Sequence, residues 1–98
     1  MIRAIITRKI ATGKEPIVDE LLKELRIAAT RQPYYVSGET LRAVDDPSVR
    51  VVLSTWTNVD AWNIWAESQD RIMLEQMIDS MLVGHPQISL CCIDRPTA

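Results

Sequence analysis

Four stretches of the chain have the β-branched and apolar composition of β-strands. They cover Ile2–Ala11, Tyr34–Val44, Val49–Trp56 and Gln87–Ile93. The turn residues Asp-Asp-Pro-Ser at 45–48 join the second and third strands into a predicted hairpin. Gly38 predicts a bulge or bend in the second strand, because glycine inside a strand often marks such an irregularity.

Two helical regions separate these strands. In the first, apolar residues recur with the helical period between Pro16 and Pro33. Proline is favoured in the first turn of a helix, and the residue before a proline resists helical geometry. Both ends of this helix are therefore predicted.

The second helical region is divided. Thr57 or Asn58 can cap a helix that runs to about Ser68, and a further helical segment starts near Gln69 and ends at Gly84. The element order is thus β-α-β-β-α-β with a divided second helix. This order predicts an α+β fold, ferredoxin-like, with an antiparallel sheet.

Helices cover only one face of such a sheet, yet the strands are apolar on both faces. The third strand places Val49, Val51 and Leu53 on one side. Val52 and Trp56 lie on the other side. A large apolar face without a cover is typical of an interface. We therefore expect a homodimer that forms through the sheet face.

Length and charge limit the classes of function. The 98 residues predict one domain, 1–98, in which 94–98 form a tail. The net charge of −2, without a block of like charges, does not favour nucleic-acid binding. No apolar run approaches the roughly 20 residues of a membrane span, and the charged N-terminus makes a poor signal peptide. We expect a cytoplasmic protein that binds neither nucleic acid nor membrane.

Cys91 and Cys92 are the two cysteines, and they are neighbours in the last predicted strand. Adjacent strand residues point to opposite faces, so we expect one sulfur on each side of the sheet. This pattern predicts two small buried thiols in a reducing compartment. The chain has one histidine, and the cysteine spacing does not fit zinc, so no metal site is expected.

The segments QPYYVSGETL and DDPSVRVVLSTWTNVDAWNIWAESQDR resemble the antibiotic biosynthesis monooxygenase domain family. The resemblance extends over roughly Ile2 to Ile93. It implies a dimeric α/β barrel, in which two ferredoxin-like units join sheet to sheet. The chain departs from the family at Tyr34, where many relatives have glycine ahead of the second strand.

One branch of that family oxidises anthrone-type aromatic molecules with oxygen and no cofactor. Its site combines an Asn, a Trp, a Tyr and an Arg. By this resemblance the Trp corresponds to Trp56, the Asn to Val52, the Tyr to Trp62 and the Arg to about Gln76. One of the four residues is therefore retained, so the branch's polar site does not transfer intact.

A second branch degrades haem. Its Trp corresponds to Trp65, but its Asn corresponds to Thr7, and its iron-binding His falls near Glu75. The single histidine, His85, lies in a Gly-His-Pro loop away from that helix. Haem therefore has no obvious proximal ligand, and this branch is disfavoured.

Three tryptophans fall within ten positions, and they are the first candidates for a ligand pocket. Trp62 and Trp65 are three residues apart and share one helix face. Aromatic residues at this spacing usually fill a core. Because the family's pocket lies between this helix and the sheet, we expect Trp65 to line a cavity and Trp62 to lie nearer the core. Trp56, at a strand end, could do both.

Other side chains complete the candidate set. Arg71 is expected to bind an acidic group or oxyanion of a ligand, or else to pair with Asp70 or Glu67 at the helix start. Met73 and Met77 recur every four residues and could flank a planar ligand, or fill gaps in the core.

Tyr35 offers a phenol near the rim of the expected pocket. Glu75 and Asp79 are four residues apart on the same helical segment. We expect both carboxylates to be solvated.

These residues support two hypotheses about function. The first is a cofactor-independent monooxygenase that acts on a small aromatic or quinone-like molecule in an apolar pocket. The second is a non-catalytic dimeric protein that binds a small hydrophobic molecule in the same pocket. The scarcity of polar catalytic residues favours the second hypothesis, and the family resemblance favours the first.

Overall fold

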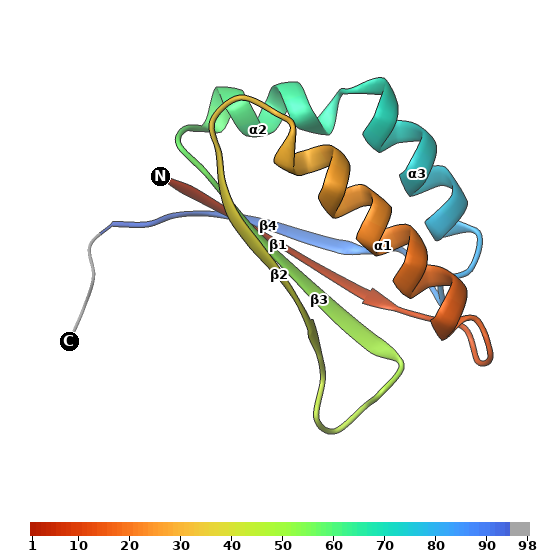
Figure 1. Cartoon of the computed structure of the whole chain (residues 1–98). Helices are drawn as coiled ribbons and strands as arrows, with labels where there is room; N and C mark the ends of the chain where they lie inside the picture. The colour runs from red at the N-terminus through yellow and green to blue at the C-terminus, as the bar shows by residue number, and fades with distance from the viewer. Residues whose placement is uncertain (95–98) are drawn as a thin grey trace.

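Helices cover one face of a four-stranded antiparallel sheet in the computed structural model, which describes residues 1–94 (Figure 1). The elements are β1 (Ile2–Lys9), α1 (Glu15–Thr30), β2 (Tyr35–Arg42), β3 (Val49–Trp56), α2 (Val59–Ala66), α3 (Gln69–Asp79) and β4 (Gln87–Cys92). The predicted ferredoxin-like fold with a divided second helix is confirmed. Of the predicted tail, 94–98, only Asp94 lies within the described residues.

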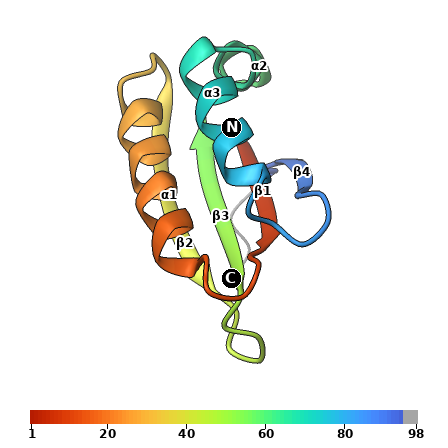
Figure 2. The same ribbon diagram turned by 90° about the vertical axis from the view of Figure 1, so that its right-hand side faces the viewer.

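The sheet has the strand order β2-β3-β1-β4, so the first and third strands are central. In β1 the residues at even positions from Ala4 to Arg8 are buried against the helices. Their neighbours at odd positions point to the opposite face, where Ile5 pairs with Leu53 and Thr7 with Val51. This opposite face is the one that no helix covers in Figures 1 and 2.

Side-chain caps begin the two short helices. The Asn58 side chain accepts a hydrogen bond from the backbone N–H of Ala61 at 2.8 Å, which starts α2. The Ser68 hydroxyl accepts one from the backbone N–H of Arg71 at 3.3 Å, which starts α3. The cap at Ser68 explains why the second helical region is two helices, since each helix needs its own start.

The entry to β2 is irregular. Tyr34 has φ of 67°, the left-handed conformation that glycine adopts without strain. This is the position where the resemblance implies glycine. The sheet register shifts between Tyr35 and Ser37. The bulge therefore lies ahead of Gly38, whereas the sequence predicted it at the glycine itself.

Strand β4 lies at the sheet edge beyond the helices, as Figure 2 shows. All six of its residues are exposed, and so are Cys91 and Cys92. The prediction of two buried thiols is therefore wrong for the described chain, because the helices cover the central strands and leave this edge strand open. Within residues 1–94, no helix has the length and apolar character that crossing a membrane requires.

Candidate functional site

A small, partly open cavity lies between the helical layer and the sheet, with a volume of about 40 Å³. Its inner wall is buried and its outer wall is exposed. The buried lining comprises Ile6, Arg8, Leu22, Leu25, Ala29, Trp62 and Trp65. The exposed lining residues Arg26, Glu39 and Thr40 belong to α1 and β2. The cavity therefore opens between α1 and β2, which lie side by side in Figures 1 and 2.

An aromatic cluster centred on Trp56 supports the two tryptophans of the cavity lining. Trp56 is fully buried and stacks on Trp65, with ring centroids 6.2 Å apart and planes at 23°. Trp56 also meets Trp62 and Tyr35 edge to face, at centroid distances of 6.1 and 5.3 Å. Such pairs add stability beyond their buried area, so this cluster holds both helix α2 tryptophans in fixed orientations.

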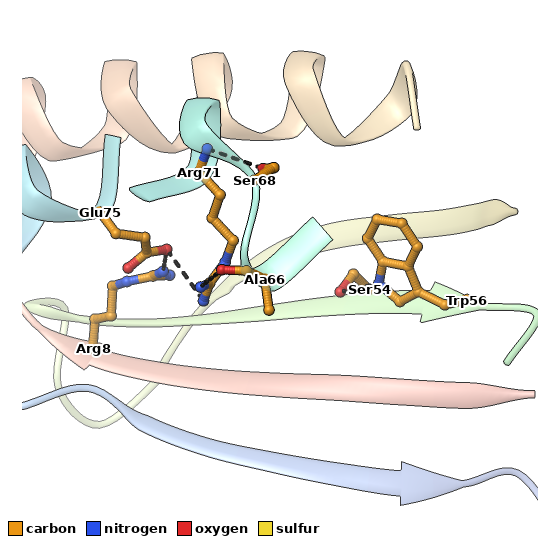
Figure 3. Close-up of polar contacts among 7 residues, drawn as sticks. All are labelled: Arg8, Ser54, Trp56, Ala66, Ser68, Arg71 and Glu75. Carbon is orange, nitrogen blue, oxygen red and sulfur yellow. Dashed lines mark hydrogen bonds and ion pairs between the residues drawn. The ribbon is translucent and has the colours of Figure 1, made fainter. Parts of the chain in front are cut away.

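Two arginines of the cavity lining, Arg8 and Arg71, meet Glu75 between β1 and α3. Figure 3 shows these three side chains. We call this arginine end the inner end of the cavity. The Arg8 guanidinium on β1 donates through Nη2 to Glu75 Oε1 on α3. Arg71 Nη2 lies 3.7 Å from the same carboxylate oxygen, and Arg71 Nη1 donates to the Ala66 carbonyl at 3.3 Å. The Arg71 guanidinium also lies over the Trp62 ring, 5.3 Å from its centroid.

Arg8 is the most unusual member of this cluster. Its side chain has no exposed surface, and its Nε and Nη1 have no hydrogen-bond partner among the described residues. Burial lowers the pKa of Arg8, although Glu75 acts in the opposite direction. Arg71 lowers it further by repulsion. The site therefore holds a desolvated cation with unused donors.

Tyr35 and Ser54 supply hydroxyl groups to the cavity wall. Ser54 Oγ accepts a hydrogen bond from the Trp56 indole N–H at 3.0 Å (Figure 3). The Tyr35 hydroxyl lies against Gly38: a Cβ atom at that glycine would be 2.5 Å from the phenol oxygen. Only glycine at position 38 therefore leaves the Tyr35 hydroxyl in its place.

The structure brings together four of the residues singled out in the sequence. Trp62, Trp65, Arg71 and Tyr35 all line the cavity. Trp62 and Trp65 are equally inaccessible, with 5% and 3% of their surface exposed, so the structure does not separate them into core and pocket residues. Trp56 lies behind them and is not part of the lining.

Helix α3 presents a different face to the cavity from the one predicted. Met73 and Met77 are 56% and 53% exposed and do not line the cavity. The buried face instead runs through positions 71, 74, 75 and 78. Glu75 therefore points inward with its side chain 13% exposed, so the expectation that it is solvated is wrong. Arg71 pairs with Glu75, and neither Asp70 nor Glu67 is its partner.

Sequence reasoning missed Arg8. The signal was present in the alternation of the first strand, where Ala4, Ile6, Arg8 and Ile10 occupy the same face. A charged residue in an otherwise apolar inward series is uncommon and calls for a buried partner. Its partner, Glu75, is 67 residues away along the chain. No local pattern connects the two.

Comparisons with known proteins identify the family. The model of the antibiotic biosynthesis monooxygenase family matches residues 1–71. The chain belongs to the antibiotic biosynthesis monooxygenase family. The match includes three strands, α1, α2 and the start of α3, and it ends at Arg71.

Several solved structures share the fold. A crystal structure described as an antibiotic biosynthesis monooxygenase has a TM-score of 0.89 at 19% identity, covering 97% of this chain and 100% of that one. A variant of SnoaB, a cofactor-independent oxygenase from Streptomyces nogalater, has a TM-score of 0.84 at 16% identity, covering 97% and 95%. A conserved protein from Methanosarcina mazei has a TM-score of 0.88 at 13% identity, covering 92% and 89%. No curated protein sequence matches the chain.

The described residues do not gather metal ligands. Within 1–94, no three His, Cys, Asp or Glu side chains come together in a way that could hold a metal ion. Glu75, near which the resemblance places the histidine of the haem-degrading branch, is held between Arg8 and Arg71. The residues present therefore do not fit an iron ligand at this position.

Proposed function

We propose that this chain is a cofactor-independent monooxygenase that acts on a small aromatic or quinone-like molecule. The observation that supports the proposal most is the cavity itself, because its buried lining combines two indole rings with the guanidinium of Arg8. SnoaB, a cofactor-independent oxygenase, has the same fold. The volume of about 40 Å³ holds on the order of three water molecules. One edge of a planar molecule would enter it, and the rest would extend toward the mouth between α1 and β2.

The chemistry that suits this site begins with an anion of the substrate. A CH₂ group between two aromatic rings loses a proton, and the resulting carbanion transfers an electron to O₂. The carbon radical and superoxide combine into a peroxide anion, which takes back the proton to give a hydroperoxide. The hydroperoxide loses one water molecule and leaves a carbonyl. The net change converts CH₂ and O₂ into C=O and H₂O. Buried guanidinium N–H groups stabilise the developing negative charge, and the apolar walls keep water from the intermediates.

Oxygen consumption tests this proposal directly. Purified protein would be mixed with a panel of anthrones and hydroquinones in an oxygen electrode cell, and the product analysed by mass spectrometry after reaction under ¹⁸O₂. We expect uptake above the uncatalysed rate for an anthrone, and one labelled oxygen atom in the product. If no member of the panel consumes oxygen above background, this protein is not the proposed oxygenase.

A non-catalytic binding protein is the alternative, and one observation favours it. Among the lining residues, the single carboxylate is that of Glu39, which is exposed and pairs with Leu53 in the register of the face away from the helices, and no imidazole is present. The inner cavity therefore has no evident general base. In that case the same ligands would bind and oxygen uptake would stay at background.

The proposal includes a homodimer that forms through the sheet face. Ile5, Val51 and Leu53 lie on this face, which no described helix covers. The proposed location of the protein is the cytoplasm.

The dimer can be tested by a substitution on this face. Leu53→Asp would place a charge in the interface and shift the protein to monomer, as measured by light scattering. Met73→Asp, on the exposed side of α3, is the matched control and would leave the dimer intact. A wild-type monomer at micromolar concentration would contradict the dimer.

A further inference from the structure

The buried guanidinium of Arg8 carries more donors than its neighbours use. Nη2 donates to Glu75, whereas Nε and Nη1 are buried without a partner in the described part of the chain. A buried donor without a partner is costly, and a charged one more so. Arg8 lines the cavity, but its side chain has no exposed surface, so an acceptor that enters the cavity reaches Nε or Nη1 only when neighbouring side chains move apart.

The charge balance points to an anion. The inner cluster contains Arg8 and Arg71 but one carboxylate, Glu75. The two arginine side chains are 0% and 12% exposed, so solvent screens them weakly. Arg26 adds a third guanidinium to the lining, whereas the lining carboxylate residue, Glu39, pairs with Leu53 in the register of the face away from the helices. An incoming negative charge would therefore be stabilised at the inner end.

A second buried arginine shows what a satisfied site looks like. Arg50 is paired with Arg8 in the register of β1 and β3, and it is 6% exposed. Its Nε and Nη2 donate to both carboxylate oxygens of Asp19, at 2.9 and 3.2 Å, and its Nη1 donates to the Pro47 carbonyl. Arg50 does not line the cavity. The fold can therefore supply hydrogen-bond acceptors to all the guanidinium nitrogens of a buried arginine. It leaves two donors of Arg8 without acceptors beside the cavity.

We infer that Arg8 is a binding residue for a ligand that combines a planar aromatic body with an ionised oxygen, carboxylate or phenolate. The oxygen accepts hydrogen bonds from Arg8 Nε or Nη1, and the ring lies against Trp62 and Trp65. The inference rests on the proposed function only in placing the ligand in this cavity. Binding alone can test it, with or without turnover.

Two probes distinguish a ligand carboxylate from a ligand phenolate. Benzoate is compared with benzyl alcohol, its neutral counterpart of similar size, by isothermal titration calorimetry. 4-Nitrophenol is titrated with pH, because the absorbance of its phenolate reports how much of the bound probe is ionised. We expect at least a tenfold preference for one anion over its neutral form, since hydrogen bonds from charged donors are strong. The anion that is preferred identifies the oxygen as carboxylate or phenolate.

Variants assign the preference to Arg8. Arg8→Met should abolish the tenfold preference. Folded Arg50→Met protein, the matched control, should retain it. The Arg8 Nε–H resonance in the wild-type protein gives a second readout that needs no variant, and it should shift on addition of the preferred anion.

Two results would overturn the inference. The first is that neither anion binds more tightly than its neutral form, which would mean that water alone occupies the inner cavity. Alternatively, the preference would persist in Arg8→Met with the wild-type resonance unmoved. A protein that prefers the anion but consumes no oxygen would contradict the proposed oxygenase and leave this inference standing.

Discussion

Replacing Glu75 with glutamine tests whether the arginine cluster is as desolvated as the structure shows. The substitution removes the carboxylate charge that Arg8 and Arg71 share while it keeps a side chain of the same size. Removing one partner of a buried ion pair costs about 3–5 kcal/mol, because the remaining charge stays buried. Glu75 is 13% exposed and glutamine retains an acceptor, so we expect the lower end, about 3 kcal/mol.

Urea denaturation measures this cost as a change in the free energy of unfolding at constant m-value. In a domain of this size, about 3 kcal/mol corresponds to a fall in Tm of roughly 12 °C or more. Arg8→Met alone should cost no more than about 1 kcal/mol, since it removes a poorly satisfied charge and keeps the apolar stem. In the Arg8→Met background, Glu75→Gln should then cost less than about 1 kcal/mol. The cycle should therefore give a coupling energy of about 2 kcal/mol.

Asp19→Asn is the matched control for Glu75→Gln. Asp19 pairs with the other buried arginine, Arg50, but its side chain is 47% exposed, so solvent replaces much of what is lost. We expect a cost of about 1 kcal/mol or less. If Glu75→Gln costs no more than Asp19→Asn, Arg8 is hydrated in solution, and the reasoning about a desolvated cation is refuted.

Three further predictions follow from other parts of the structure. Tyr34→Gly should raise the free energy of unfolding by about 1 kcal/mol by relieving the left-handed φ of 67°, whereas Tyr34→Ala should not; equal stability of both variants in urea would contradict the strain. Trp65→Phe should cost no more than about 2 kcal/mol and weaken ligand binding; a large loss of stability with unchanged calorimetric affinity would make Trp65 a core residue only. Hydrogen bonds from Ser48 lower the pKa of Asp46, so the ionised carboxylate contributes stability above its usual pKa, and this contribution is lost as pH falls through the lower folded value. Carboxyl NMR should show the Asp46 pKa rising toward its usual value in Ser48→Ala, and an unchanged titration would argue against those hydrogen bonds.

The order of strands and helices could be predicted from the sequence because it depends on local signals. The helical period after Pro16, the hairpin turn at 45–48 and the cap at Asn58 each act within a few residues. The spacing of Trp62 and Trp65 placed both on one helix face for the same reason. Both tryptophans line the cavity because α2 packs with that face toward it.

The features that the sequence did not reveal depend on contacts between distant segments. The inward rotation of Glu75 is fixed by its pairing with Arg8, and it carries Met73 to the exposed side of α3. The exposure of Cys91 and Cys92 depends on how far the helical layer extends over the sheet. Composition and periodicity contain no information on the pairing of Glu75 with Arg8 or on how far the helices extend over β4.

Oxygen uptake by a pair of variants on β2 tests the central claim, that the cavity between α1, α2 and the sheet is where the chemistry occurs. Gly38→Ala adds a Cβ atom 2.5 Å from the Tyr35 hydroxyl and must displace it, whereas Ser37→Ala changes the exposed neighbour. With an anthrone that wild-type protein oxidises, we predict at least a tenfold loss of oxygen uptake in Gly38→Ala and wild-type uptake in Ser37→Ala, both variants remaining folded by circular dichroism. Equal uptake by folded Gly38→Ala and wild-type protein would place the reaction elsewhere and contradict the account.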